Sequence, residues 1–429
     1  MKLYRGVAVW DAERKKAELC DLRVENGIIA AVEPAGTFEY GAAFEGRGRT
    51  ALLPGFVNAH GHPSMTLLRG LGEELPLMDW LTKKIFPVEE KMDAAAIKTG
   101  AQLAMLEMLA TGTTCFADMY FFEESVAEAA LEFGMRAGLT RGIVDFRNGV
   151  GEIKLSEGLE LASRYNGAQG LINIQLGPHA SYTLNLDMTK KIAAAALEYD
   201  LGAQLHWLET SQDWPKTAES ASMTPEEYLE ESGLLKLKQL TLAHCVMMEK
   251  EKMPFYARGN ITVVHNPKSN LKLGSGIAPV EAMRRAGISV ALGTDGACSN
   301  NMLDMWDELR FAALLQKGIS QDPTLISAEY ALEMATVAGA KALGFATTGL
   351  IKPGYTADFA LVDLDKAHYT GWTPENLAGY LVYSGSSADI VETVVAGRTL
   401  YSRGEFPGTD AAALRAKAAQ TRKELISAL

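Results

Sequence analysis

The sequence predicts an α/β fold: a (β/α)8 TIM barrel with a small β-sandwich domain built from both chain termini. Three observations lead to this fold: eight short apolar strand candidates, amphipathic helical patterns between them, and alternating, glycine-punctuated segments at both ends. The 429 residues exceed one ordinary domain and leave room for a barrel and a smaller accessory unit.

The strand candidates lie between about residues 51 and 345 and alternate with helical segments. In chain order they read ALLPGFVNAH, TTCFADM, MRAGLTRG, LINIQLGP, GAQLHWL, QLTLAHC, NITVVHN and ISVALGTD. In residues 93–112, apolar side chains recur every three or four positions, and Gly112 suits the end of a helix. Eight parallel βα units of this kind close into a barrel.

The two chain ends carry short alternating runs that indicate antiparallel hairpins. Examples are LRVENGIIAAVEP near the N-terminus and IVETVVAGRTLYSRG near the C-terminus. We therefore expect a sandwich built from residues 1–53 and 350–405, a barrel at residues 54–349 and a terminal helix at residues 406–429.

The composition excludes several classes of protein. With 41 basic and 53 acidic residues, the net charge of −12 disfavours nucleic acid and anionic membranes as partners. The four cysteines form no CxxC pair, which argues against a disulfide scaffold or a thiolate zinc site. The N-terminus lacks a signal-peptide pattern, and no apolar run has membrane-spanning length, so the cytoplasm is the expected compartment.

Histidines gather at the carboxyl ends of the predicted barrel strands, where barrel enzymes keep their active sites. Of the seven histidines, only His368 falls elsewhere. The six at strand ends are His60, His62, His179, His206, His244 and His265. Asp295 adds a carboxylate at the end of the eighth strand candidate.

These side chains offer a set of metal ligands. His60 and His62 are two residues apart, so their imidazoles leave the same face of a strand. Together with His206 and Asp295 they supply three nitrogen ligands and one oxygen ligand. The sequence therefore predicts one divalent metal, with zinc favoured, although iron or manganese would also accept this set.

Five segments resemble the amidohydrolase superfamily: PGFVNAHGH, HWLET, LAHC, HNPKSNLKLGSG and GTDGACSNN. They are most similar to the branch that contains 5′-methylthioadenosine/S-adenosylhomocysteine deaminases and triazine chlorohydrolases, and the resemblance spans essentially the whole chain. Binuclear members usually place a carboxylated lysine or a glutamate at the end of the fourth strand. Here that end reads GPHASYT with His179, so the resemblance implies a single metal.

The resemblance also implies a reaction, in which hydroxide attacks C6 of an adenosine-type nucleoside to give the inosine analogue and ammonia. Glu209 is similar to the family's proton shuttle between the water and a ring nitrogen of the substrate. The resemblance places His244 beside the attacking water. Asp295 would both bind the metal and orient the hydroxide.

The segment MDWLTKKIFPVEEKM resembles the part of the adenosine-type deaminases that holds the nucleoside. Glu89 matches the carboxylate that binds the ribose 2′- and 3′-hydroxyls, and Trp80 matches an aromatic wall against the 5′ substituent. In the family pattern His179 reaches the ribose or purine edge and Ser299 lines the purine pocket. Glu209 would contact the same ring as it shuttles the proton.

Arg141 matches an arginine that reaches the amino-acid end of S-adenosylhomocysteine from a neighbouring subunit, which implies a homo-oligomer. The family's second arginine falls near Lys154, with Arg147 as a competitor. A lysine would replace a guanidinium fork by a point charge. The choice among S-adenosylhomocysteine, methylthioadenosine, adenosine and 5′-deoxyadenosine therefore stays open, as does the role of His265.

Two other functions are considered. The same scaffold could remove a halide, alkylamine or amino group from a free triazine, pterin or guanine, but Glu89 and Trp80 favour a nucleoside because a free heterocycle offers no diol. A non-catalytic interaction protein is the third hypothesis, against which the complete set of metal ligands argues.

Overall fold

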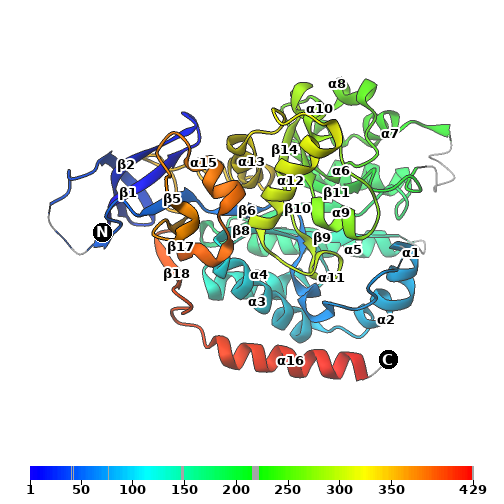
Figure 1. Ribbon diagram of the computed structural model, residues 1–429. Coiled ribbons are helices and arrows are strands. Elements are labelled where there is room, and N and C mark those ends of the chain that lie inside the picture. Colours follow the sequence, from blue (N-terminus) through cyan, green and yellow to red (C-terminus); the bar gives the residue numbers. More distant parts are fainter. Residues whose placement is uncertain (40, 42, 76, 146–148, 215–221, 428–429) are drawn as a thin grey trace.

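The computed structural model describes residues 1–429 except 40, 42, 76, 146–148, 215–221 and 428–429. Its main body is a barrel of eight parallel strands, adjacent in the order β14-β13-β12-β11-β10-β9-β8-β6 (Figure 1). These strands are β6 (Phe56–Asn58), β8 (Thr113–Tyr120), β9 (Arg136–Ile143), β10 (Ile172–Pro178), β11 (Gly202–Trp207), β12 (Leu240–His244), β13 (Ile261–His265) and β14 (Ser289–Leu292). All eight predicted strands are present, and the barrel fold is confirmed.

The barrel closes between its first and last strands. The Ala59 N–H donates to the Leu292 carbonyl at 2.9 Å, and the Asp295 N–H donates to the His60 carbonyl at 3.0 Å. Just beyond, β7 (Gly61–His62) and β15 (Asp295–Gly296) pair in parallel. Gly293 permits this approach, because a Cβ there would lie 2.6 Å from the His60 carbonyl oxygen. Closure therefore brings the two histidines of the first strand beside Asp295.

Helices surround the barrel and connect its strands. The carboxylate of Asp93 accepts from the Ala96 N–H at 2.8 Å and starts α3, and Gly112 lies just past its end at φ +86°. The helices of this layer are α3 (Ala94–Ala110), α4 (Glu123–Phe133), α5 (Val150–Tyr165), α6 (Leu186–Glu198), α7 (Pro225–Ser232), α8 (Met253–Tyr256), α9 (Pro267–Lys272), α10 (Val280–Arg285), α11 (Ala297–Asn300), α12 (Met305–Ser320) and α13 (Ala328–Ala335). Two short helices, α1 (Leu77–Trp80) and α2 (Phe86–Glu89), follow the first strand.

The amino ends of the strands are covered by α14 (Val337–Ala342). Two side chains of the barrel interior donate to the carbonyl of the last residue of α14. Gln175 Nε2 donates to the Ala342 oxygen at 3.0 Å, and Thr241 Oγ1 donates to the same oxygen at 3.1 Å. The interior there is filled by small apolar residues such as Ala59 and Ala338. In the described part of the chain, α14 therefore closes the amino ends of the strands.

The two chain termini share one eight-stranded sheet, in the order β18-β17-β16-β5-β1-β2-β3 with β4 beside β1. Its alternate residues face opposite ways: Leu53 and Ala360 pack on the barrel, whereas Leu52 and Phe359 belong to the sheet's own core. The strands are β1 (Lys2–Asp11), β2 (Lys16–Glu25), β3 (Ile28–Pro34), β4 (Ala43–Glu45), β5 (Thr50–Pro54), β16 (Phe359–Asp363), β17 (Ile390–Val395) and β18 (Arg398–Ser402). The predicted accessory unit from both termini is thus confirmed.

This sheet is not wholly antiparallel. β1 pairs in parallel with both β4 and β5, because these strands return to it through a connection longer than a hairpin turn. A buried ion pair joins the sheet segment to the barrel, with Arg136 Nε 2.7 Å from Asp358 Oδ2. The boundaries at residues 53, 349 and 405 remain predictions.

The remaining helices are α15 (Leu377–Gly379) and the terminal α16 (Ala411–Ser427). In Figure 1 α16 runs along the barrel beside α3, and Ala418 and Leu425 are buried in the cluster that contains α3 residues. Within the described residues, no helix is both long and apolar enough to cross a membrane.

Candidate active site

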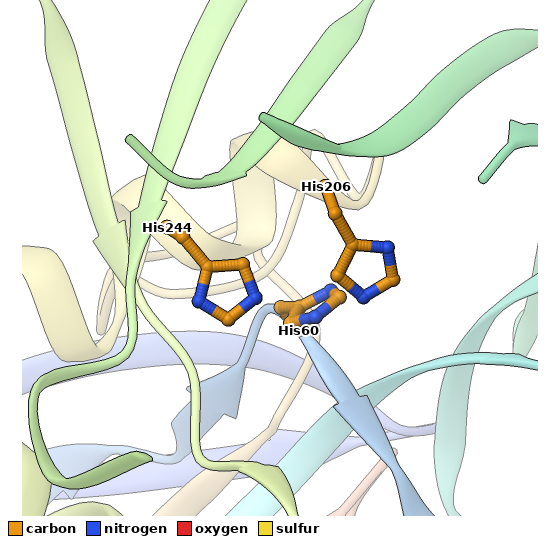
Figure 2. Close-up of side chains that lie close together, drawn as sticks. All are labelled: His60, His206 and His244. Carbon is orange, nitrogen blue, oxygen red and sulfur yellow. The ribbon is translucent and has the colours of Figure 1, made fainter. Parts of the chain in front are cut away.

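Four of the predicted strand-end histidines converge at the mouth of the barrel. Figure 2 shows the rings of His60, His206 and His244 pointing toward one another from three different strand ends. The centroid of the His60 ring lies 4.9 Å from that of His206, 5.4 Å from that of His244 and 5.1 Å from that of His62. All four side chains are buried.

Among the described residues, two groups of side chains each have their ligand atoms within 4.8 Å of one another, and His60 belongs to both groups. One group contains His60, His206 and His244, and the other contains His60, His62 and Asp295. Asp295 Oδ1 lies 3.2 Å from His62 Nε2 and 3.8 Å from His60 Nε2. The four predicted ligands therefore surround one region, with His244 as a fifth neighbour.

The residues at this point fit a divalent metal. Within the described part of the chain, the buried Nε2 of His60 has no hydrogen-bond partner, which is costly unless a ligand satisfies it. Burial lowers the pKa of His60 to about 3 and lowers the pKa of His206 well below its usual value, so both imidazoles are neutral. Neutral imidazoles and a carboxylate are the ligands that zinc and iron accept.

The other ring nitrogen of each imidazole faces an oxygen atom. Because an oxygen acceptor requires a proton on the facing nitrogen, Nδ1 carries the proton and the Nε2 lone pair is left for a ligand. The Nδ1 contacts are His60 to Gln204 Oε1 at 2.8 Å, His62 to the Met119 carbonyl at 2.8 Å, His206 to the His179 carbonyl at 3.0 Å, and His244 to Asn270 Oδ1 at 2.8 Å.

The carboxylate of Asp295 is held in a similar way. Its Oδ2 accepts hydrogen bonds from Ser269 Oγ at 2.5 Å and from Ser299 Oγ at 2.9 Å, while Oδ1 faces the imidazoles. Asp295 and His244 both have positive φ, 61° and 73°, a backbone conformation that non-glycine residues rarely adopt. Such strain concentrates at functional sites, where the surrounding structure enforces it.

Glu209 lies at the edge of the cluster, with Oε2 4.0 Å from His244 Nε2. Burial raises the pKa of Glu209 to about 6, so its carboxyl can both accept and release a proton near neutral pH. The loop around it is fixed by Asp213, whose Oδ2 accepts from the backbone N–H of Glu209 at 2.7 Å. Burial acts to lower the pKa of His244, but the carboxylates of Glu209 and Asp295 outweigh it and raise that pKa.

The residues predicted to hold the nucleoside lie around this centre. Glu89, at the end of α2, is partly buried and accepts a hydrogen bond from the Tyr120 hydroxyl at 2.5 Å. The His179 ring lies 4.6 Å from the His206 ring. Trp80 is buried, and its Nε1 donates to the Leu71 carbonyl at 3.0 Å. The roles of these residues toward a substrate stay predictions.

The predicted 5′-group residues lie farther out, on β9 and α5. Arg141 Nε donates to Glu157 Oε2 at 2.8 Å, so its guanidinium is bound within its own subunit. Lys154 is half-buried, and burial followed by the charge of Arg141 lowers its pKa. Arg147 lies outside the described residues. The approach of an arginine from a neighbouring subunit remains a prediction.

Several residues of the site were not predicted from the sequence. Gln204 precedes His206 by two, so strand alternation could have found it. Ser269 and Asn270 lie on α9, and nothing in the sequence pattern indicates their partners. His265 is fully buried, and within the described residues neither ring nitrogen has a hydrogen-bond partner, so its role stays undecided.

Comparisons with known proteins agree with this geometry. Residues 51–400 match the model of the Amidohydrolase family. A 5-methylthioadenosine/S-adenosylhomocysteine deaminase from Dictyoglomus thermophilum is 39% identical over 401 residues, covering 93% of each chain. An adenosine deaminase structure from Xanthomonas campestris with bound zinc has a TM-score of 0.92 at 33% identity, over 99% of this chain and 98% of that one. The zinc complex of atrazine chlorohydrolase from Arthrobacter aurescens has a TM-score of 0.91 at 25% identity, over 98% and 100%. The chain belongs to the amidohydrolase family.

Proposed function

We propose that this chain is a hydrolytic deaminase of adenosine-type nucleosides, which replaces the 6-amino group by oxygen and releases ammonia. The observation that carries the proposal is Glu209, a buried carboxyl with a pKa raised to about 6, beside converging imidazoles. Similarity over 93% of the chain to a relative named as a 5-methylthioadenosine/S-adenosylhomocysteine deaminase supports it.

We propose that His60, His62, His206 and Asp295 hold one divalent ion, and that the ion is zinc. Two structurally similar proteins, an adenosine deaminase and an atrazine chlorohydrolase, contain zinc, although iron or manganese would also suit these ligands. When bound, such an ion supplies a Lewis acid that makes hydroxide available near neutral pH. The Nδ1 contacts of the histidines would keep their Nε2 atoms directed at it.

The protein's own groups would then move the protons. Glu209 would accept a proton from the attacking water at its carboxylate and deliver it to a ring nitrogen of the purine. His244 Nε2, 4.0 Å from Glu209, would hydrogen-bond to the same water. Asp295, whose Oδ2 is fixed by Ser269 and Ser299, would orient that water with Oδ1.

The nucleoside would be held by groups around the mouth. We propose that Glu89 accepts hydrogen bonds from the ribose 2′- and 3′-hydroxyls, because a carboxylate offers two acceptor oxygens to a vicinal diol. His179 would contact the ribose or purine edge, Ser299 the purine, and Trp80 the 5′ side. Arg141 and Lys154 would face a 5′ substituent that carries a carboxylate. We also propose a homo-oligomer, which light scattering in solution would test.

An ammonia-release assay tests the function directly. We expect turnover of adenosine, methylthioadenosine, S-adenosylhomocysteine or 5′-deoxyadenosine, with elemental analysis of the same sample giving one metal per chain. Turnover of guanine alone, with no nucleoside accepted, would overturn the proposal.

A second candidate is the hydrolysis of a free heterocycle. The observation that favours it is the TM-score of 0.91 to an atrazine chlorohydrolase. That relative is 25% identical, against 39% for the curated deaminase, so we rank this function second. Atrazine in the same assay, with chloride measured in place of ammonia, decides between them.

A further inference from the structure

Tyr120 is the last residue of β8, and its side chain lies between the imidazole cluster and Glu89. Its hydroxyl donates to Glu89 Oε1 at 2.5 Å, and its ring centroid lies 6.0 Å from that of His62. Among the described residues, no other side chain donates a hydrogen bond to Glu89. Tyr120 is therefore the group that fixes one oxygen of this carboxylate.

Tyr120 is itself held firmly. Its backbone N–H donates to Glu123 Oε1 at 2.7 Å, and its buried ring stacks on Phe121 with centroids 4.2 Å apart. The preceding residue, Met119, accepts the Nδ1 proton of His62 on its carbonyl at 2.8 Å. Met119 thus contacts the metal-ligand candidate His62, and the next residue, Tyr120, contacts the sugar-binding candidate Glu89. Because Met119 and Tyr120 are adjacent in the chain, they set the distance between these two parts of the site.

We propose that Tyr120 is a positioning residue that makes the site specific for a ribose diol, because its hydroxyl holds Glu89 in the orientation that accepts both sugar hydroxyls. This inference rests on the proposed function, since Glu89 has this role only toward a nucleoside.

The hydroxyl of Tyr120 also affects the charge of Glu89. Burial raises the pKa of Glu89, whereas the hydrogen bond from Tyr120 and the nearby His62 act to lower it. Only an ionised carboxylate accepts at both oxygens without donating a proton of its own. Loss of the Tyr120 hydroxyl would therefore impair both the orientation and the charge that a diol requires.

The test compares adenosine with 2′,3′-dideoxyadenosine, which carries the same purine and 5′-hydroxyl but no diol. Because hydrogen bonds to charged groups are strong, Tyr120→Phe should raise the KM for adenosine about tenfold. The KM for 2′,3′-dideoxyadenosine should stay within about twofold, as expected of independent sites. The kcat for both should change little, because the reacting atoms are not touched.

A double variant shows whether Tyr120 acts through Glu89. In the Glu89→Ala background, Tyr120→Phe should add no further change in KM for adenosine, because the carboxylate that Tyr120 holds is already absent. Tyr369→Phe is the matched control: Tyr369 is buried, and its hydroxyl donates to Asp389 at 3.1 Å in the C-terminal segment. That variant should leave both substrates unaffected.

Equal losses on the two substrates, or additive effects in the double variant, would overturn the inference. If Tyr120→Phe does not fold, a crystal structure of the unaltered protein with bound adenosine provides the test. A Tyr120 hydroxyl that donates to Glu89 while Glu89 accepts from both ribose hydroxyls supports the inference, and a Glu89 that reaches the diol without Tyr120 overturns it. Failure of the proposed function is recognised separately, since the unaltered enzyme would then deaminate neither nucleoside.

Discussion

The inner wall of the barrel mouth and its outer rim hold their charged and polar side chains differently. On the inner wall, each candidate ligand has an outer atom fixed by a neighbour and an inner atom directed at the centre: His60 is held by Gln204, and Asp295 by Ser269 and Ser299. On the rim, the guanidinium of Arg141 is turned to Glu157. Neighbouring side chains thus fix the centre, whereas on the rim the Arg141 guanidinium is bound by Glu157.

The inner wall thus holds the groups proposed for the reaction, and the rim holds those proposed to select the substrate. Side chains that their neighbours already fix lose little conformational freedom when they bind a metal. The fold itself therefore prepares the metal site for the reaction. An arginine that must leave an ion pair before it binds a carboxylate gains less from doing so. We infer that the 5′ group is recognised weakly, and that the following variants should show decreasing effects from the centre outward.

The largest effect is expected at a ligand of the centre. His206→Ala removes one of the converging imidazoles and should lower both the metal content and the deaminase activity, the latter about 10⁴-fold or more. Elemental analysis and ammonia release measure the two quantities. His368→Ala is the control, because its imidazole lies in the C-terminal segment beside Asp389. A metal-replete and active His206→Ala protein would contradict the ligand assignment.

Glu209→Gln should separate metal binding from proton transfer. The amide keeps the shape of the side chain but cannot take a proton from water, so turnover should fall about 10²- to 10⁴-fold. The metal content should equal that of the unaltered enzyme, because Glu209 is not among the proposed ligands. Near-normal turnover would remove Glu209 from the proton-transfer role.

Gln204→Leu tests the contacts behind the ligands. It leaves His60 Nδ1 without its acceptor, so the ring loses its fixed orientation, and metal affinity should fall about 10- to 100-fold. Competition with a chelator measures the affinity. Gln316→Leu is the matched control, because Gln316 is also buried and donates to the Ala278 carbonyl at 2.8 Å, away from the imidazoles. Equal affinities in both variants would mean that the Gln204 contact is dispensable.

The proximity of the side chains at this centre could be predicted from the sequence, whereas their roles stay predictions. Strand ends are marked by a change of pattern, and histidines at these ends necessarily meet at the barrel mouth, so His60, His206 and Asp295 could be grouped without coordinates. Gln204 obeys the same alternation and was within reach of this reasoning.

The rest depended on tertiary packing. Ser269 reaches Asp295 from α9, a helix whose direction no periodicity reveals. Likewise, the sequence marks Arg141 as a carboxylate-binding candidate, but it cannot show that Glu157 on α5 already occupies the guanidinium. The parallel pairing of β1 with β4 and β5 was missed for a related reason, since register between distant segments is set by packing.

The smallest effect is expected at this rim, where one variant should lower the KM for S-adenosylhomocysteine and another should raise it. Glu157→Gln removes a partly exposed ion pair of Arg141, whose Nη1 keeps its hydrogen bonds to the Tyr120 and Gly142 carbonyls, and the worth of that pair limits the gain to about fivefold. The KM for S-adenosylhomocysteine should therefore fall by up to about fivefold, whereas the KM for methylthioadenosine, which has no carboxylate, should not change. Arg141→Leu should move the first KM upward and again leave the second unchanged. If both substrates respond equally to both variants, Arg141 supports the fold of β9 and α5, and the 5′ carboxylate is bound elsewhere.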